Sequence, residues 1–352
     1  MIKKVAVIIS PNWHDYAEKY IDDCLAGIRA QDYQGEMKLF ITDNETSDKS
    51  YDFLRYKMPE AEIWRNQNND GFAKGCNDSM KKALAEGFDY IFNLSIHSIM
   101  EPSCISQLAA AAESDSRIGA VQALSLLYPE KDKILSLGNA THFLGFGYCL
   151  GYKDKKETVR PGIRDIFYPS GGSFFLKREI LEKVGMFDEE YWMYNEDQEL
   201  GWRIWLSGFR CVLAPQAVMY SQYNFLRSVS KYYWMDRNRI LAILECYDIL
   251  TLILIAPAFL IMELGLVLFS LQNGSFNEKL KVWNYFLTAK NWQYIKTARA
   301  RNQQLRKIKD KEIARLITGK IWYQEVGDWK LRLINPIFNA YWVLVRVVLT
   351  FL

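Results

Sequence analysis

The first half of the chain alternates short apolar runs with longer segments in which apolar residues recur at helical spacing. Val5–Ile9 is a run of mostly β-branched residues, which is typical of a buried strand. Tyr16–Ala30 carries apolar residues such as Cys24 and Ile28 that would share one face of a helix. The same alternation predicts strands at Met37–Thr42, Glu62–Asn66, Tyr90–Leu94, Gly119–Leu124, Gly172–Lys177 and Arg210–Ala214, and helices at Tyr51–Lys57, Phe72–Gly87, Ser103–Glu113, Arg178–Val184 and Asp197–Ser207.

Because strands and helices take turns along the chain, we expect an α/β fold with a mostly parallel, Rossmann-like sheet and flanking helices. Ligands of such sheets bind beyond the carboxyl ends of the strands. Asp43-Asn44 and Ser95–Ser98 fall at those ends. Residues 125–168 are Gly-rich and lack a clear period, so we expect loops with a small antiparallel excursion there.

The C-terminal third has a different pattern. Residues 249–271 are apolar over a length sufficient to span a bilayer, but Pro257 and Glu263 interrupt them. A single crossing would also place the basic stretch 272–332 outside, against the positive-inside tendency. We therefore expect a broken, re-entrant or interfacial helical hairpin at 249–271.

The tail 333–352 is apolar and aromatic but interrupted by polar residues, which predicts an interfacial helix. The alternative is that both apolar segments are buried helices of a globular C-terminal domain. The pattern thus divides the chain into an α/β domain at 1–240 and a helical, membrane-associating region at 241–352.

Charge and cysteine usage sharpen this picture. The chain of 352 residues has a net charge of +3, but residues 272–332 hold 14 Lys/Arg against 5 Asp/Glu. Such a basic stretch beside hydrophobic segments favours an anionic membrane surface over nucleic acid. The six cysteines lack CxxC spacing, and no signal peptide is visible, so we expect reduced thiols on the cytoplasmic side.

Two polar segments follow early strands. Asp43 and Asn44 open the stretch 43–48, where a carboxylate and an amide could hydrogen-bond a nucleobase and a ribose; Asx residues after a strand are also ordinary turn formers. The stretch 65–77 is a polar loop with glycines that leads into a helix, and a helix N-terminus favours phosphate oxygens. A plain helix cap would explain the same residues.

Two later segments carry glycines and carboxylates. Gly171-Gly172 precede a strand, where they allow close backbone approach to a ligand or form a simple bulge. In the stretch 185–203, an aromatic loop ends at Glu196-Asp197, which open a helix. A carboxylate at this place could deprotonate a hydroxyl group. An acidic helix start that complements the helix dipole is the structural alternative.

Taken together and in this order, the four segments resemble the family 2 glycosyltransferases of the GT-A fold. The resemblance covers about residues 3–240 and is closest to the bacterial rhamnosyltransferase-like branch, which builds cell-surface polysaccharides. The stretch from Ser170 to Tyr220 matches this branch closely, and the later Tyr233 and Arg237-Asn238-Arg239 also fit its pattern.

The resemblance implies a role for each site residue. Asp197 would be the general base of an inverting transfer, with Glu196 in support, and Asp43 would contact the uracil or thymine base and its ribose. The donor-binding residues expected from the resemblance are Asp43, Asn44, Asn69, Gly71, Phe72, Asn77, Ser95, His97, Gly171 and Gly172. Those expected on the acceptor side are Trp192, Tyr194 and Arg203.

The element that should hold a metal ion departs from the family pattern. The family normally carries an Asp-x-Asp-like or Asn-Pro-Asp sequence whose last carboxylate holds Mg²⁺ or Mn²⁺ on the diphosphate. Here the segment reads Ser95-Ile96-His97, and the His usual shortly after the strand near residue 218 is also missing. Three alternatives stay open. His97 ligates a softer ion such as Mn²⁺, a protein cation neutralises the diphosphate instead, or the protein binds without catalysing.

The resemblance thus implies an enzyme of EC class 2.4 that moves a hexosyl or rhamnosyl group. The donor would be a dTDP- or UDP-sugar, and the acceptor a lipid-linked or growing cell-surface polysaccharide, at the cytoplasmic face of the cell membrane with peripheral or re-entrant C-terminal anchoring. The alternative is a catalytically silent, sugar-nucleotide-binding scaffold of a polysaccharide assembly complex. Nucleic acid is not an expected partner, and homo-oligomer formation stays open.

Overall fold

The computed structural model describes residues 2–12, 16–44, 47–222, 229–322 and 329–351. The chain divides into two compact units. Unit 1 comprises residues 1–139, 149–204 and 209–224, and unit 2 comprises residues 140–148, 205–208 and 225–352.

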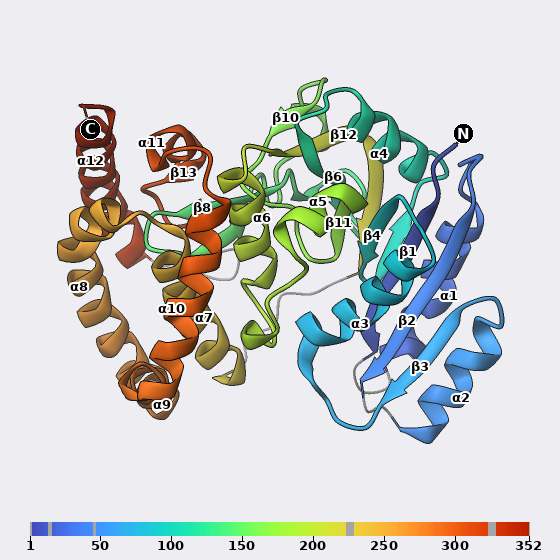
Figure 1. Ribbon diagram of the computed structural model, residues 1–352, viewed down its shortest axis with the longest axis horizontal. Coiled ribbons are helices and arrows are strands. Elements are labelled where there is room, and N and C mark those ends of the chain that lie inside the picture. The colour runs from blue at the N-terminus through green and yellow to red at the C-terminus, as the bar shows by residue number, and fades with distance from the viewer. Residues whose placement is uncertain (1, 13–15, 45–46, 223–228, 323–328, 352) are drawn as a thin grey trace. The chain divides into compact units, whose positions relative to one another are not determined.

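Unit 1 is built on one large mixed sheet (Figure 1). Its strand order is β10-β12-β6-β11-β4-β1-β2-β3, and β5 and β7 pair with β12 and β6. The neighbours β4-β1-β2-β3 and the pair β6-β12 are parallel, whereas β11 runs antiparallel between β4 and β6. These strands are β1 Val5–Asn12, β2 Met37–Asn44, β3 Glu62–Asn66, β4 Tyr90–Leu94, β5 Ser98–Met100, β6 Ile118–Leu127, β7 Ile134–Ser136, β10 Arg164–Asp165, β11 Ser173–Lys177 and β12 Arg210–Ser221.

Helices cover both faces of this sheet, as the alternation of the sequence predicts (Figure 1). They are α1 Tyr16–Arg29, α2 Asp48–Lys57, α3 Gly71–Ala85, α4 Cys104–Glu113, α5 Arg178–Val184 and α6 Glu196–Leu206. Val7 and Ile9 are among the strand residues fully buried against helices such as α1 and α4. The expected α/β class with a mostly parallel sheet is therefore confirmed.

Unit 2 is mainly helical. Its helices are α7 Val229–Cys246, α8 Ile249–Gln272, α9 Phe276–Leu287, α10 Ala289–Leu305, α11 Asp310–Ile313 and α12 Trp329–Phe351. A small sheet of order β13-β8-β9 is formed by Ile317–Thr318, Asn139–His142 and Gly147–Cys149. Its strands β8 and β9 fall in the middle of the loosely patterned region 125–168.

The segment expected to be a broken hairpin is a single continuous helix, α8, with Pro257 inside it. Pro257 lacks the N–H that would bond to a carbonyl one turn earlier. The Tyr341 hydroxyl donates to the nearby Leu254 oxygen at 2.6 Å, which satisfies one carbonyl beside the proline. Among the described residues, α8 and the Arg332–Phe351 part of α12 are long and apolar enough to cross a membrane, by length and composition alone.

Candidate active site

The loop 170–172 lies at the centre of the candidate site because three distant residues bind its backbone. The Gly171 N–H donates to Asp197 Oδ2 at 2.8 Å, and the Ser170 N–H donates to Gln122 Oε1 at 2.8 Å. The Asn93 side-chain amide donates to the Gly171 carbonyl. The site therefore joins strands β4 and β6 to the start of α6.

The two acidic residues at the start of α6 have different surroundings. Glu196 is buried, its Oε2 has no hydrogen-bond partner, and burial together with the charge of Asp197 raises its pKa well above the usual value. Asp197 is half-buried and accepts the N–H groups of Gly171 and Gln198. Burial raises the pKa of Asp197 to about 6, although these hydrogen bonds oppose the rise. Burial thus favours the neutral form of Glu196, whereas the two N–H donors favour the ionised form of Asp197, which makes Asp197 the candidate base of the pair.

The turn before this acidic pair has an unusual backbone. Trp192, Tyr194 and Asn195 have φ angles of 57°, 69° and 64°, in the left-handed region that costs most side chains energy. The Asn195 amide donates to Gln198 Oε1, which ties the turn to α6. Such backbone persists where the surrounding structure fixes it, so the turn holds Glu196-Asp197 in one orientation.

Two of the expected glycines are required by close packing. Gly71 has φ +86°, and a Cβ there would lie 2.5 Å from the Trp192 carbonyl oxygen. A Cβ at Gly172 would overlap the Ser95 hydroxyl, and the Ser95 N–H donates to the Gly172 carbonyl at 3.1 Å. Both positions therefore exclude a side chain, and Trp192 contacts the donor side of the site through Gly71.

The expected base-binding residues cluster where β2 ends and α3 begins. Asp43 is fully buried, with Oδ2 at 3.6 Å from Arg65 Nε. The Asn44 amide donates to the Gly71 carbonyl at 2.7 Å, and Asn69 Oδ1 accepts the Gly71 N–H at 3.2 Å. Asn44 and Asn69 thus shape the loop that enters α3. Glu45 and Thr46, which belong to the same sequence segment, lie outside the described residues.

Three more expected residues hold the framework. Phe72 packs on Phe187, with ring centroids 6.0 Å apart. The Asn77 amide makes two hydrogen bonds with the Phe187 backbone, at 2.8 and 3.1 Å. Arg203 is 1% exposed and pairs with Glu199 at 2.7 Å, so its guanidinium cannot reach an acceptor in this arrangement. Tyr194 and Trp192 stay half-buried on the expected acceptor side.

The position expected to hold a metal ion has a different chemistry. His97 Nδ1 lies 3.1 Å from Ser221 Oγ, and its ring packs edge-on against Tyr16 and Tyr20. Burial lowers the pKa of His97 to about 4, so the ring is neutral at pH 7. Within the described part of the chain, no three His, Cys, Asp or Glu side chains gather as metal ligands. Because these donors do not fit a hard divalent cation, no step of the proposed reaction uses one.

The sequence pattern did not predict a role for Asn93 and Gln122, two buried amides that hydrogen-bond the backbone of the loop 170–172. A signal was present, because each is a polar side chain inside an otherwise apolar strand. A buried amide in a strand needs a hydrogen-bond partner, and here the partner is a loop distant in sequence.

The fold of unit 1, a mostly parallel α/β sheet with the acidic pair Glu196-Asp197 beside the loop 170–172, is that of the GT-A class. Residues 7–185 match the model of the family described as "Glycosyl transferase family 2", and the chain belongs to that family.

Individual relatives are distant. An N-acetylglucosaminyl-diphospho-decaprenol L-rhamnosyltransferase of Mycobacterium tuberculosis is 36% identical over 63 residues, which are 18% of this chain and 20% of that protein. The structure of GalNAc-T7 with UDP, GalNAc and Mn²⁺ superposes with a TM-score of 0.54 at 14% identity, covering 71% of this chain and 49% of that one. The structure of S. aureus TarS has a TM-score of 0.51 at 14% identity, covering 99% and 54%. The chain thus spans about half of these two structures, which share its fold.

Proposed function

We propose that this chain catalyses an inverting transfer of one sugar from a dTDP- or UDP-sugar to a lipid-linked or growing cell-surface polysaccharide. In this proposal residues 1–240 are the catalytic domain. The helical region 241–352 keeps it at the cytoplasmic face of the cell membrane. The observation that carries the proposal is the environment of Asp197, a half-buried carboxylate that accepts the N–H groups of Gly171 and Gln198 beside the buried Glu196.

The chemistry follows from that environment. Asp197 takes the proton of the acceptor hydroxyl group while the oxygen of that hydroxyl group attacks the anomeric carbon of the donor sugar. The bond from that carbon to the diphosphate oxygen breaks on the opposite face, so the configuration inverts and the nucleoside diphosphate leaves. A general base works best when its pKa lies near the working pH. The pKa of Asp197, about 6, meets this condition.

The donor is expected to lie along the strand ends between β2 and the loop 170–172. Asp43 would meet the base and ribose, Gly71 would let the diphosphate approach the start of α3, and Gly172 would lie beside the sugar. Ser95 and His97 would border the diphosphate without a resident cation. The contact of His97 Nδ1 with the Ser221 hydroxyl, where the family pattern has a second metal ligand, supports this metal-free form of the site.

The acceptor class is suggested by two features. The partial match with a mycobacterial rhamnosyltransferase supports a rhamnosyl donor and a diphosphate-linked lipid as the first compounds to assay. Trp192 and Tyr194 precede the catalytic pair, and aromatic rings suit contact with sugar rings. Arg203 is left out of the acceptor site because it is buried against Glu199.

An assay of radiolabelled sugar transfer from UDP- and dTDP-sugars tests the proposal, with Asp197→Asn as the matched variant. We expect transfer by the wild type and a loss of about 10²–10⁴-fold in the variant, the usual contribution of a general base. Thermal protection by UDP or dTDP should be equal in both proteins, since Asp197 is not placed against the nucleotide.

The silent scaffold is the second candidate, and the altered metal position favours it. It requires nucleotide binding without turnover. Background-level transfer in both proteins, with protection by the nucleotide retained, would establish the scaffold and reject the enzyme.

A further inference from the structure

Helix α8 exposes large apolar side chains along one stripe. Five of them recur at intervals of three, four or seven residues, which places them on one side of the helix. They are 56–69% exposed and are Ile253, Leu260, Leu264, Leu268 and Leu271. The buried residues of α8 are Thr251, Ile255, Ala258 and Ser270, so its buried side holds apolar residues as well as hydroxyl groups. An ordinary surface helix instead presents polar side chains to water.

Helix α12 is apolar on two opposite sides. One side packs inside unit 2, where the Trp342 ring stacks on the Phe143 ring with the ring centroids 5.2 Å apart. The Trp342 indole N–H also donates to the Ile317 carbonyl at 3.0 Å. The other side is exposed and also apolar. It consists of Leu333, Ile337, Leu344, Val347 and Phe351, each at least 50% exposed. Water is a poor environment for this second side.

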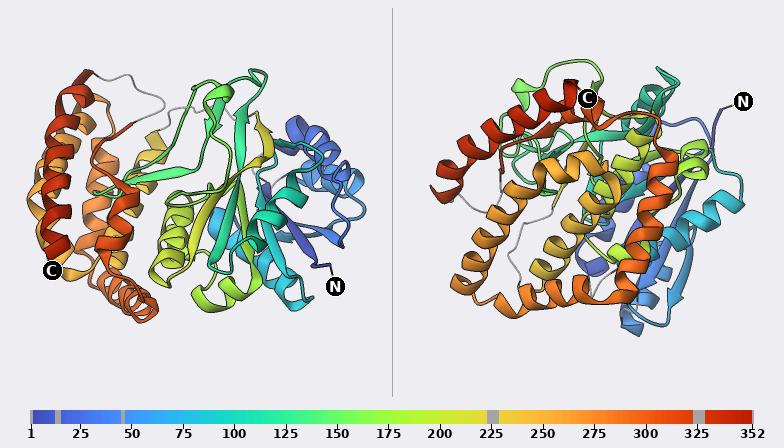
Figure 2. Two further views of the ribbon diagram at one scale, coloured as in Figure 1. Left: turned by 90° about the horizontal axis from the view of Figure 1, so that it is seen from above. Right: turned by 60° about the vertical axis from the view of Figure 1, so that its left-hand side comes forward.

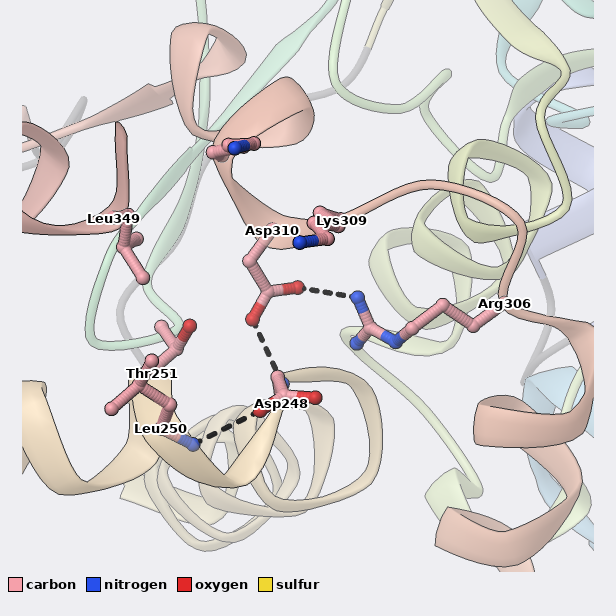
Figure 3. Close-up of a pocket in the computed structure, with 8 residues that line it drawn as sticks. Asp248, Leu250, Thr251, Arg306, Lys309, Asp310 and Leu349 are labelled. Carbon is pink, nitrogen blue, oxygen red and sulfur yellow. Dashed lines mark hydrogen bonds and ion pairs between the residues drawn. The ribbon is translucent and has the colours of Figure 1, made fainter. Parts of the chain in front are cut away.

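The two helices lie side by side and run antiparallel (Figure 2). The hydrogen bond from Tyr341 to Leu254 joins the middle of α12 to the N-terminal part of α8. At the start of α8, Leu349 and Thr251 line a small pocket of about 180 Å³ (Figure 3). In this pocket Asp310 accepts hydrogen bonds from Arg306 at 2.7 Å and from the Asp248 N–H at 2.8 Å.

A buried cluster of four charges fixes the centre of α8 to its neighbours. Lys279 of α9 binds Asp236 at 2.7 Å and Glu263 at 2.6 Å, and Arg239 of α7 pairs with the same two carboxylates. If α8 crossed a bilayer, these charges would have to enter the hydrocarbon or lose their partners. The cluster therefore favours a helix that lies along the unit instead of crossing a membrane.

Exposed aromatic and basic residues of unit 2 suit a lipid headgroup region. Trp283, Trp292 and Trp322 are 37–58% exposed, and tryptophan prefers the membrane interface. Exposed cations in the same unit include Lys281, Lys290, Lys296, Lys309 and Lys311. Anionic phospholipids attract such residues.

We infer that α8 and α12 dock unit 2 onto an anionic bilayer in the plane of one leaflet, with the two exposed apolar stripes in the lipid and neither helix crossing. This docking surface of α8 and α12 makes the membrane location proposed above more specific and rests on it. It does not require the transferase chemistry, because vesicle binding and sugar transfer are measured separately.

Co-sedimentation of the full chain with vesicles tests the lipid partner. The wild type should bind vesicles of phosphatidylethanolamine and phosphatidylglycerol. Its affinity for vesicles of phosphatidylcholine should be about tenfold lower. Replacing three stripe residues together, Leu260→Gln, Leu264→Gln and Leu344→Gln, should lower binding at least about tenfold because apolar insertion is lost. The control Tyr56→Gln changes a side chain that is 80% exposed in unit 1 and should bind like the wild type.

Labelling with a membrane-impermeant maleimide separates docking from crossing. Tyr56→Cys marks the chain before α8, and Gln304→Cys marks an exposed position of α10 after it. In intact cells both thiols should stay unlabelled, and both should react after permeabilisation, with the parent chain as background. Labelling of one thiol alone in intact cells would establish a crossing helix and overturn the inference.

A second copy of the chain is the competing occupant of the stripes. In that case the lipid-free protein would sediment as a dimer, the three glutamine substitutions would yield a monomer, and vesicles would not bind. This set of results would also overturn the inference, whatever the transfer assay gives.

Discussion

At the scale of single residues, the acidic pair separates into two roles because the two carboxyl groups have different neighbours. Glu196 is buried with an unsatisfied oxygen, so burial and the charge of Asp197 keep its proton in place. Asp197 has two backbone N–H donors and some access to solvent, so it ionises first. The pair can therefore accept one proton at Asp197 near neutral pH.

The pH dependence of transfer follows from Asp197. Because the basic form is required and the pKa is raised to about 6, kcat/KM should fall as the pH drops below about 6 and level off above it. The decrease is measured by determining kcat/KM for the acceptor at a series of pH values. A value of kcat/KM that stays constant from about pH 5 to about pH 8 would show that Asp197 is not the base.

Metal dependence is decided at His97 and Ser221. Since His97 Nδ1 contacts the Ser221 hydroxyl and hydroxyl groups replace the carboxylates that a hard cation prefers, the metal-free form of the proposal predicts that transfer is unchanged by EDTA. His97→Gln keeps a hydrogen-bonding side chain and should retain transfer within about tenfold, because a hydrogen bond between neutral groups contributes about 1 kcal/mol. If EDTA abolishes transfer and Mn²⁺ restores it in the wild type but not in His97→Gln, His97 is a metal ligand.

The sequence allowed the catalytic pair and the glycines to be predicted, because their local order resembles a family pattern. Asn93 and Gln122 could not be predicted, since their role depends on the loop 170–172 folding against strands far away in the chain. The burial of Arg203 could not be predicted either, because its partner carbonyl at Met186 lies on a separate turn.

At the scale of elements, the strands with long apolar runs were predicted and the short ones were not. β1 and β4 each begin with an apolar run, whereas β10 has only two residues and no period to detect. The continuity of α8 was also missed, because a proline usually breaks a helix and the packing of α12 beside Pro257, which includes the hydrogen bond from Tyr341 to Leu254, depends on residues far away in the chain. Pairing between distant elements, which the sequence pattern does not encode locally, decides these cases.

The charge cluster that joins α7, α8 and α9 should be a major source of stability for unit 2. Burial alone would raise the pKa of Asp236, but Arg239 and Lys279 hold it below its usual value, so the Asp236 carboxyl group stays ionised. Lys279→Met leaves two buried carboxylates with one cation and should lower the free energy of unfolding by about 3–5 kcal/mol. Chemical denaturation measures the change.

Lys281→Met is the matched control for that experiment. Lys281 lies on the same helix two residues away, but it is 63% exposed, so its loss should change stability by no more than about 0.5 kcal/mol. Equal losses for the two variants would mean that the buried cluster does not stabilise the helices.

At the scale of the whole molecule, the chain combines a candidate catalytic site with a surface that suits a lipid bilayer. The site of unit 1 has the chemistry for a water-soluble nucleotide sugar. The stripes of α8 and α12 in unit 2 have the chemistry for a bilayer, where a lipid-linked acceptor would be dissolved. Confinement to a membrane raises the effective concentration of such an acceptor without any new contact to it.

The three-residue stripe variant, Leu260→Gln with Leu264→Gln and Leu344→Gln, should therefore separate the two substrates. Transfer to a lipid-linked acceptor in anionic vesicles should fall about tenfold, through a higher apparent KM, because the variant spends less time on the membrane. Transfer to a short-chain, water-soluble acceptor should keep its wild-type kcat and KM, since the substitutions leave Asp197 and the loop 170–172 untouched. Equal losses on both acceptors would mean that the stripes support the catalytic site itself, and equal retention would mean that the acceptor reaches Asp197 from water.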